Sequence, residues 1–320
     1  MSTVDPSAEQ LEDRLAALGV GRVHRLAGGA SGLTYAGTTP DWHRVVVKVA
    51  PAGLPPVLNR DVLRQSRLLR ALSGSSVPVP EVIWEDAGDP PEMPPLFVMS
   101  FVEGTSFEPL FDAHGNEDVD IVADRMRTAA RVMAALHAVD PETIGLQDEP
   151  ILGPADEVDR WCRLLETVDT ELAPGWEEIA GLLRAAAPMP LRPAIVHGDF
   201  RLGNILATGS TVNSIIDWEI WTIGDPRVDL GWFLVNADPE TYRRMTPFSG
   251  ALPKPAELAA VYGSVPDVTW FEALACFKSV ATWSRIVKHN RRRPAPDDEL
   301  EGMAEVLPHL LERVGNHLNG

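Results

Sequence analysis

The spacing of hydrophobic residues differs between the first hundred residues and the rest of the chain. In the first part, short apolar runs bounded by glycine, proline and polar residues predict β-strands at 23–26, 34–38, 45–49 and 96–102. The same part contains two segments of helical spacing, 8–18 and 59–72. Farther along, helical spacing prevails and predicts helices at 119–139, 155–170, 174–187 and 270–287. The pattern therefore predicts an α+β protein whose strands are concentrated at the start of the chain.

One segment among the later helices has a strand-like pattern. Apolar runs at 195–196 and 214–216 each lead into an acidic residue, and the short polar stretch 207–210 lies between them. This order predicts a strand, a loop and then a β-hairpin. The hairpin would bring together three polar side chains, those of Asp199, Asn204 and Asp217.

These three residues have the order that phosphoryl transfer requires. The reaction needs a carboxylate to orient and deprotonate the attacking hydroxyl, and hard oxygen ligands to hold Mg²⁺ against the nucleotide phosphates. In kinases an Asn follows the base by five positions and a second Asp comes later. Asn204 is five residues after Asp199, and Asp217 follows in the second run. We therefore predict Asp199 as the base, Asn204 and Asp217 as the metal ligands, and Arg201 as a cation facing the transferred phosphoryl group.

A lysine within an apolar strand is the second candidate for this chemistry. Lys48 stands among the valines of 45–49, so its side chain either reaches an edge of the sheet or points into a functional site. In the kinase plan, a lysine in such a strand binds the nucleotide phosphates and is held by a glutamate of the next helix. The helix at 59–72 places Gln65 at that position, with Asp61 as the alternative if the register shifts. Gln65 can accept a hydrogen bond from Lys48 through its amide oxygen but carries no charge.

Three sequence motifs resemble the aminoglycoside phosphotransferase (APH/choline kinase-like) family. They are the segments 197–204, 216–219 and 224–230, and the segments 28–35, 77–80 and 97–104 agree with the same family. Gly198 stands where eukaryotic protein kinases have arginine, and this separates the two groups. Within the family, the chain is most similar to the phosphotransferase-like domain fused to some acyl-CoA dehydrogenases. The resemblance extends from about residue 20 to 290.

The resemblance implies a two-lobed, protein-kinase-like α+β fold. Its N-terminal lobe would comprise residues 1–103, with an antiparallel sheet and a helix, and its mostly helical C-terminal lobe residues 104–320. Backbone groups between Ser100 and Val102 would bind the adenine edge at the junction. In the glycine-rich loop, Ser31 and Gly32 would approach the phosphates. The implied activity is Mg²⁺- and ATP-dependent phosphorylation of a small-molecule hydroxyl, with GTP as the alternative donor.

Composition narrows the choice of partner and compartment. The net charge is −18, of which −15 falls after residue 104, so a nucleic-acid backbone would be repelled. The acidic second part either favours a cationic acceptor or only promotes solubility. Two distant cysteines, Cys162 and Cys276, suggest neither a disulfide framework nor a zinc site, which fits a reducing cytoplasm. The N-terminus lacks a signal-peptide pattern and no apolar run is long enough to span a membrane, so we expect no membrane partner.

Several alternatives stay open on the sequence alone. Aminoglycosides would suit the acidic second part, whereas a hydroxyacyl or other lipid-like metabolite would suit the aromatic helix at 270–287. The alternative outside the enzymes is a nucleotide-binding pseudokinase or interaction module. It is favoured by Gln65, which stands where a glutamate is expected. The sequence does not specify the oligomeric state.

Three polar residues near the motifs are predicted to support the structure. His197 would brace the catalytic loop by hydrogen bonds, and Asp229 would bond the loop from behind. His137 would be a satisfied core or capping histidine.

Overall fold

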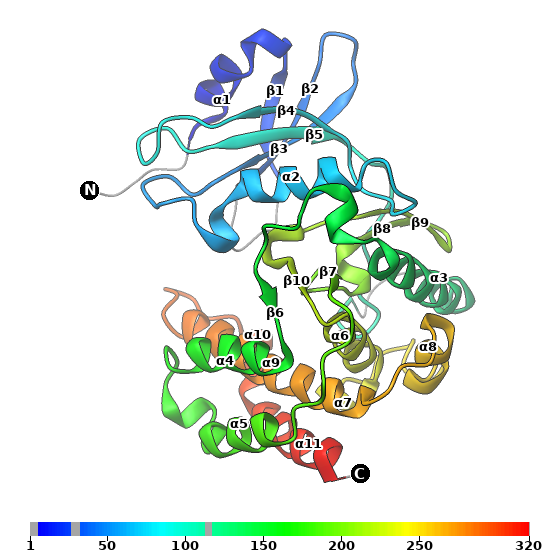
Figure 1. Cartoon of the computed structure of the whole chain (residues 1–320). Helices are drawn as coiled ribbons and strands as arrows, with labels where there is room; N and C mark the ends of the chain where they lie inside the picture. The colour runs from blue at the N-terminus through cyan, green and yellow to red at the C-terminus, as the bar shows by residue number, and fades with distance from the viewer. Residues whose placement is uncertain (1–5, 27–32, 113–116, 320) are drawn as a thin grey trace.

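The computed structural model describes residues 6–26, 33–112 and 117–319 and has two lobes, one above the other in Figure 1. The N-terminal lobe contains a sheet and the C-terminal lobe is mostly helical, which confirms the predicted α+β, kinase-like arrangement. A hydrophobic core continues from one lobe to the other, because Val46 and Phe97 of the sheet belong to the same buried cluster as Ile195 and Trp218. The two lobes are therefore parts of one packed unit.

The N-terminal lobe is a five-stranded antiparallel sheet in the order β1-β2-β3-β5-β4. Its strands are β1 (Gly21–Arg25), β2 (Leu33–Thr38), β3 (Arg44–Val49), β4 (Val82–Asp86) and β5 (Leu96–Ser100). Helix α1 (Ala8–Arg14) packs by β1, and helix α2 (Val62–Leu72) lies between the sheet and the C-terminal lobe (Figure 1). The first helix is shorter than its pattern predicted, since a 3-10 turn replaces its last part at Ala16–Leu18.

The alternation of side chains along β3 determines where Lys48 points. Val45, Val47 and Val49 pack into the cluster that includes Leu11 and Leu15 of the α1 segment. Successive side chains of a strand point to opposite faces. Lys48 and Val46 therefore occupy the other face, which is turned toward α2 and the C-terminal lobe.

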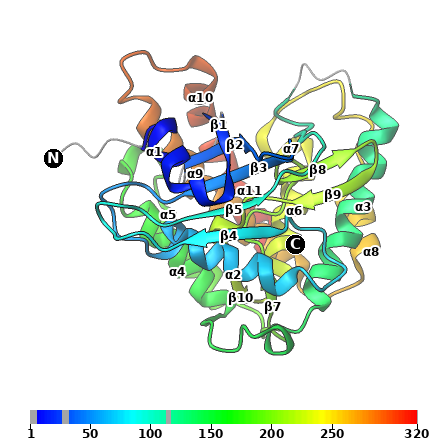
Figure 2. The same ribbon diagram turned by 90° about the horizontal axis from the view of Figure 1, so that it is seen from above.

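The C-terminal lobe is built around α9, a buried helix of 23 residues that α4, α6 and α11 contact. Its helices are α3 (Val119–Ala138), α4 (Pro154–Leu165), α5 (Trp176–Ala185), α6 (Arg227–Ala237), α7 (Pro239–Tyr242), α8 (Pro255–Tyr262), α9 (Val268–Asn290), α10 (Asp298–Gly302) and α11 (Leu307–Asn319). From above, the N-terminal sheet lies over these helices, with α3 to one side beside the β8–β9 hairpin (Figure 2). The aromatic residues of α9 are thus mainly core residues.

Two small β-structures in this lobe carry the predicted motifs. The strands β6 (Ile151–Leu152), β10 (Thr222–Gly224) and β7 (Ala194–Val196) form one sheet. The predicted hairpin is present as β8 (Ile205–Thr208) and β9 (Thr211–Ile215). The loop between β7 and β8 contains Asp199 and Asn204, and Asp217 follows β9.

Helices α6 and α9 approach each other closely at Gly231. A Cβ atom at this position would lie 2.4 Å from the carbonyl oxygen of Phe271, which cannot move as a flexible side chain would. We expect Gly231→Ala to lower the free energy of unfolding by about 3 kcal/mol, the upper range for overpacking. Chemical denaturation would measure it.

The control for this change is Gly181→Ala. Gly181 is an exposed glycine of α5 whose Cβ would meet nothing within 4 Å, so alanine there should stabilise the helix by roughly 0.5 to 1 kcal/mol. Equal effects of the two substitutions would contradict the close approach of α6 and α9.

Candidate active site

Asp199 is held by three side chains from two parts of the C-terminal lobe, its own loop and helix α6. Its Oδ2 accepts hydrogen bonds from Asn204 Nδ2 at 2.7 Å and from Arg201 Nε at 3.4 Å. Its Oδ1 accepts one from Trp232 Nε1 of α6 at 2.8 Å. The side chain keeps 25% of its surface exposed. The structure thus brings Asp199 and Asn204 into direct contact and leaves the carboxylate accessible.

Asp229 fixes the start of the same loop from below. Its Oδ2 accepts the backbone N–H of His197 at 2.6 Å, and its Oδ1 accepts that of Gly198 at 2.8 Å. Burial acts to raise the pKa of Asp229, but the hydrogen bond and charge of His137 and the charge of His197 outweigh it and hold the pKa below its usual value. The prediction that Asp229 bonds the loop from behind is confirmed. His137 is a buried partner of this acid and of the Tyr262 hydroxyl.

Gly198 and His197 give the loop its shape. Gly198 has a φ of +83°, and a Cβ atom there would lie 2.8 Å from the carbonyl oxygen of Ile220. The left-handed backbone and the lack of space explain why glycine replaces the arginine of protein kinases. His197 Nε2 hydrogen-bonds the carbonyl of Ile216 at 2.9 Å, and its Nδ1 accepts the N–H of Asp199 at 3.1 Å. The histidine braces the loop, as predicted.

Lys48 reaches across the two lobes to Asp217. Its Nζ lies 3.1 Å from Asp217 Oδ1, and the lysine is buried. Asp217 has a left-handed backbone, with φ 66° and ψ 55°, directly after the hairpin. A non-glycine residue in this region costs free energy and is typical of functional sites. The ion pair brings the predicted phosphate-binding lysine to the predicted metal ligand.

Helix α2 does not supply an acidic partner for Lys48. Gln65 is buried in α2, as expected from the register, and no hydrogen bond joins it to Lys48 in the part of the chain that the structure describes. Asp61 is the N-cap of α2, where its side chain accepts the N–H of Arg64 at 3.0 Å. The alternative with Asp61 as partner is not found in the structure, because the ion pair of Lys48 is with Asp217 and none joins it to Asp61 within the described residues.

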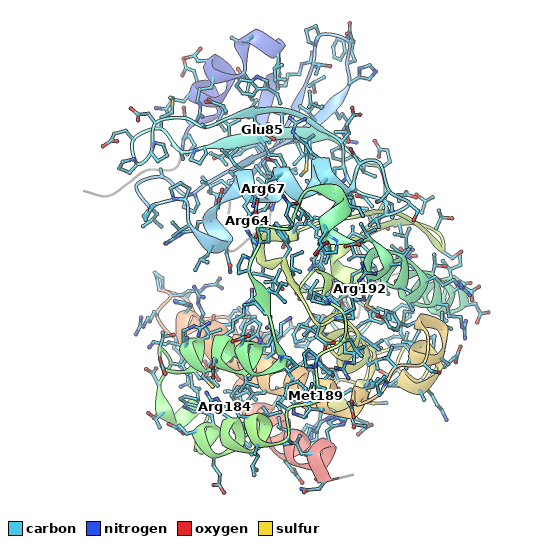
Figure 3. The ribbon with its side chains drawn as sticks, viewed as in Figure 1. Arg64, Arg67, Glu85, Arg184, Met189 and Arg192 are labelled. Carbon is cyan, nitrogen blue, oxygen red and sulfur yellow. The ribbon has the colours of Figure 1, made fainter. Side chains whose placement is uncertain are left out.

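The position of α2 is instead fixed by arginines that face the C-terminal lobe. Arg64 donates to Glu149 Oε2 at 2.7 and 2.9 Å and to the carbonyl of Trp221 at 3.0 Å, and its guanidinium lies 3.9 Å from the Trp221 ring. Arg67 pairs with the same Glu149, and Figure 3 shows both arginines on α2. Burial and the neighbouring Arg67 lower the pKa of Arg64 to about 10. These contacts join α2 to the segment that follows Asp217.

Two further carboxylates of the site were not predicted from the sequence. Glu108 is buried and accepts the N–H of Gly203 at 3.0 Å and Arg201 Nη1 at 3.3 Å. Burial raises the pKa of Glu108, although Arg201 opposes the shift, and the two carboxylates Asp199 and Glu108 raise the pKa of Arg201. Arg201 therefore lies between two carboxylates. No local sequence pattern points to Glu108, which precedes Gly203 by 95 residues.

Glu219 is the second of these carboxylates. Burial, followed by the charge of Asp217, raises its pKa to about 7, and Lys48 acts in the opposite direction. The residue follows Asp217 by two positions within the recognised motif. Its place in that motif is the sequence signal that points to Glu219.

Strand β5 ends at Ser100, two residues earlier than predicted, at the segment where the sequence predicted contacts to adenine. The N–H of Ser100 donates to the carbonyl of Glu81 at 2.8 Å, and its Oγ accepts the N–H of Glu81 at 3.0 Å. Within the described residues, no hydrogen bond involves the N–H of Val102. Val102 is thus the better placed of the two for an adenine edge. Ser31 and Gly32 lie outside the described residues.

The residues near the loop fit a nucleotide-bound Mg²⁺ rather than a metal held by protein alone. In the described part of the chain, no group of three or more His, Cys, Asp or Glu residues could hold a metal ion. Mg²⁺ bound to nucleotide phosphates needs only one or two protein oxygens. Asn204 Nδ2 is anchored on the carbonyl and Oδ2 of Asp199, which orients its amide oxygen, and the Asn204 carbonyl accepts the N–H of Ile216 beside Asp217. The two predicted ligands therefore come from neighbouring backbone segments.

Comparison with known sequences identifies the family. A sequence profile described as "Phosphotransferase enzyme family" matches residues 22–260. The chain belongs to this family. Among curated proteins, it is 25% identical over 209 residues to acyl-CoA dehydrogenase family member 10 of Mus musculus, covering 64% of this chain and 19% of that protein. It is 27% identical over 236 residues to acyl-CoA dehydrogenase family member 11 of Gallus gallus, and the match covers 67% of this chain and 30% of that protein. The chain thus aligns with less than a third of the length of each of these two relatives.

Solved structures show the same fold. A candidate aminoglycoside phosphotransferase from Ralstonia eutropha JMP134 superposes with a TM-score of 0.78 at 22% identity, covering 98% of each chain. Spectinomycin phosphotransferase APH(9)-Ia, solved with ADP and spectinomycin, superposes with a TM-score of 0.65 at 13% identity. The superposition covers 98% of this chain and 99% of that protein's chain. These likenesses confirm the two-lobed kinase-like fold of this family member. Among the described helices, none combines the length and apolar character needed to cross a membrane.

The contacts of Asp229 lead to a prediction about the loop. We expect Asp229→Asn to lower the free energy of unfolding by about 3 kcal/mol, because the amide nitrogen would face a backbone N–H and the histidines would lose their anion. Urea denaturation would measure this loss. The exposed Asp120→Asn in the first turn of α3 should change stability by less than about 0.5 kcal/mol, and a similar loss in both variants would refute the role of Asp229.

Proposed function

We propose that the protein transfers the γ-phosphoryl group of ATP, in the presence of Mg²⁺, to a hydroxyl of a small molecule. The observation that carries this proposal is the geometry around Asp199. Asn204 contacts this residue, and Lys48 reaches from the other lobe to Asp217. This arrangement matches the parts that phosphoryl transfer needs, namely a base, metal ligands and a cation for the phosphates.

Asp199 is the proposed base. A carboxylate has about four lone-pair positions, two on each oxygen. Oδ2 accepts from Asn204 and Arg201, whereas Oδ1 accepts from Trp232 within the described residues. The second position of Oδ1 is therefore available for the hydroxyl of an acceptor. A positioned base of this kind contributes roughly 10² to 10⁴ to the rate.

The proposed nucleotide site uses residues from both lobes. Oxygens of Asn204 and Asp217 hold Mg²⁺, which when bound neutralises charge on the phosphates. Lys48 contacts the phosphates from the N-terminal lobe, and Arg201 adds positive charge near the transferred group. Ser31 and Gly32, which lie outside the described residues, remain the predicted phosphate contacts of the glycine-rich loop. Backbone groups of the Ser100–Val102 segment would meet the adenine. ATP is the expected donor and GTP the alternative.

The acceptor class is supported by what similar proteins bind. Spectinomycin phosphotransferase was solved with ADP and spectinomycin, and a variant of APH(4)-Ia with ADP and hygromycin B, so hydroxyl-bearing small molecules occupy sites on this fold. The curated relatives are acyl-CoA dehydrogenase family members, which directs attention to hydroxyacyl compounds. An acceptor screen should therefore include aminoglycosides and hydroxyacyl thioesters, each followed by release of ADP.

Removal of the proposed base gives the first test. Asp199→Ala should lower turnover by about 10³-fold, because the acceptor hydroxyl loses its base, while ATP binding is kept. Steady-state kinetics with the best acceptor from the screen, together with calorimetric titration of ATP, would check both parts. Near-normal turnover in this variant would exclude Asp199 as the base.

Removal of the proposed metal ligand gives the second test. ATP with Mg²⁺ should raise the melting temperature of the wild type through binding to the folded state, and EDTA should abolish the shift. Asp217→Asn should lose the Mg²⁺-dependent part, since asparagine tolerates the left-handed backbone but has no negative charge. Exposed Asp298→Asn is the control. A shift that persists in Asp217→Asn would disprove the metal site.

Gln65 favours a second candidate, a nucleotide-binding protein without catalysis. The buried Gln65 leaves α2 without a charged partner for Lys48. Nucleotide-dependent stabilisation without transfer to any acceptor would support this candidate. Conversion of ATP to ADP that depends on an acceptor would exclude it.

A further inference from the structure

Two buried side chains from different helices meet beneath Asp199. Trp232 of α6 donates its indole N–H to Asp199 Oδ1 at 2.8 Å. Lys278 of α9 donates to the carbonyl oxygen of Gly198, and its Nζ lies 3.4 Å from the centroid of the Trp232 ring. Trp232 is 6% exposed and Lys278 is 4% exposed. Neither residue belongs to the recognised catalytic motif.

The burial of a lysine in this place is costly and needs compensation. Removing an ammonium group from water is unfavourable unless nearby groups replace the lost solvation. Burial lowers the pKa of Lys278 to about 8, and the charges of Asp199 and Asp229 act against the shift. The carbonyl of Gly198 and the faces of Trp232 and Trp161 supply the remaining stabilisation. A methionine would fill similar space without this cost, which points to a use for the charge.

The surrounding helices hold the peptide of Gly198 on both sides. Asp229 and Trp232 are three residues apart on α6 and so lie on one face of that helix. Asp229 accepts the N–H of Gly198, while Lys278 from α9 donates to its carbonyl. The close approach of α6 and α9 at Gly231 keeps these donors and acceptors in register.

We propose that Trp232 and Lys278 are positioning residues, which hold Asp199 in the rotamer that presents Oδ1 to the acceptor hydroxyl. Trp232 occupies one lone-pair position of Oδ1 and so directs the other. The cation on the ring face draws electron density from the indole and makes its N–H a better donor. Lys278 also fixes the peptide immediately before Asp199. This role rests on the proposed function of Asp199 as the base, and neither side chain moves a proton.

Kinetics of matched variants test the role. Trp232→Phe keeps an aromatic ring but removes the N–H, and Lys278→Met keeps the length but removes the charge. Each should lower kcat by at least about tenfold, with little change in KM for ATP or in the Mg²⁺-dependent melting shift, because only the base is misplaced. A structural defect alone would lower stability without this selective loss of kcat.

Both controls come from α9, the helix that also carries Lys278. Trp270 is a buried indole of α9 whose N–H donates to the carbonyl of Leu183, and Lys288 of α9 donates to the carbonyl of Thr167. Trp270→Phe and Lys288→Met should keep wild-type kcat at temperatures where the protein is folded. Equal kcat values for Trp232→Phe and Trp270→Phe would overturn the proposal.

A spectroscopic measurement tests the contact without an acceptor. The nine tryptophans give indole N–H signals in ¹⁵N-labelled protein, and Trp232→Phe identifies the signal of Trp232 by its loss. Asp199→Asn and Lys278→Met should each shift this signal, and Lys288→Met should not. A signal that Asp199→Asn leaves unmoved would overturn the proposal. If the wild type transfers no phosphate to any acceptor, the proposed function fails, and the indole signal alone then decides whether these residues orient Asp199.

Discussion

The geometry of the site depends on the buried carboxylate of Asp229. Both of its oxygens accept backbone N–H groups at the start of the catalytic loop, so the direction of the loop is set before any side chain acts. The charge of this acid is balanced by His137 and by Lys278, which come from other helices. A buried anion that is fully hydrogen-bonded fixes a single arrangement, because an unpaired alternative would be far less stable. The large helical lobe thus acts as a support for eight residues of loop.

The two lobes contribute different parts to the proposed phosphoryl transfer. The sheet supplies a cation, Lys48, from one face of β3. The valines Val45, Val47 and Val49 pack on the opposite face, against the α1 segment. The helical lobe supplies the carboxylates and the amide from two backbone segments joined through Asn204 and Ile216. Opposite charges meet between the lobes, where the phosphates of a nucleotide would replace part of the ion pair. The family assignment and the fold agree with this division.

The sequence predicted best what lies close together along the chain. The hairpin and the spacing of Asp199 and Asn204 follow from local patterns, as does the position of Lys48 in a strand. Glu108, Trp232 and Lys278 could not be found this way, because they reach the loop from segments 33 to 95 residues distant. On a helix pattern, a buried functional tryptophan cannot be distinguished from a core tryptophan. The ion pair of Lys48 is with Asp217, which lies 169 residues away, and not with Asp61, whose carboxylate caps α2.

The anchoring of α2 changes where the molecule can open. Arg64 and Arg67 bind Glu149 and the Trp221 carbonyl of the larger lobe, while Lys48 of the sheet is not tied to α2 by an ion pair within the described residues. In mechanical terms, α2 is fastened on both sides, because Ser66 and Arg70 also bind Glu85 of β4. Separation of the lobes must either break the contacts of Arg64 and Arg67 or part α2 from the sheet. The contacts that resist opening therefore lie on both sides of α2.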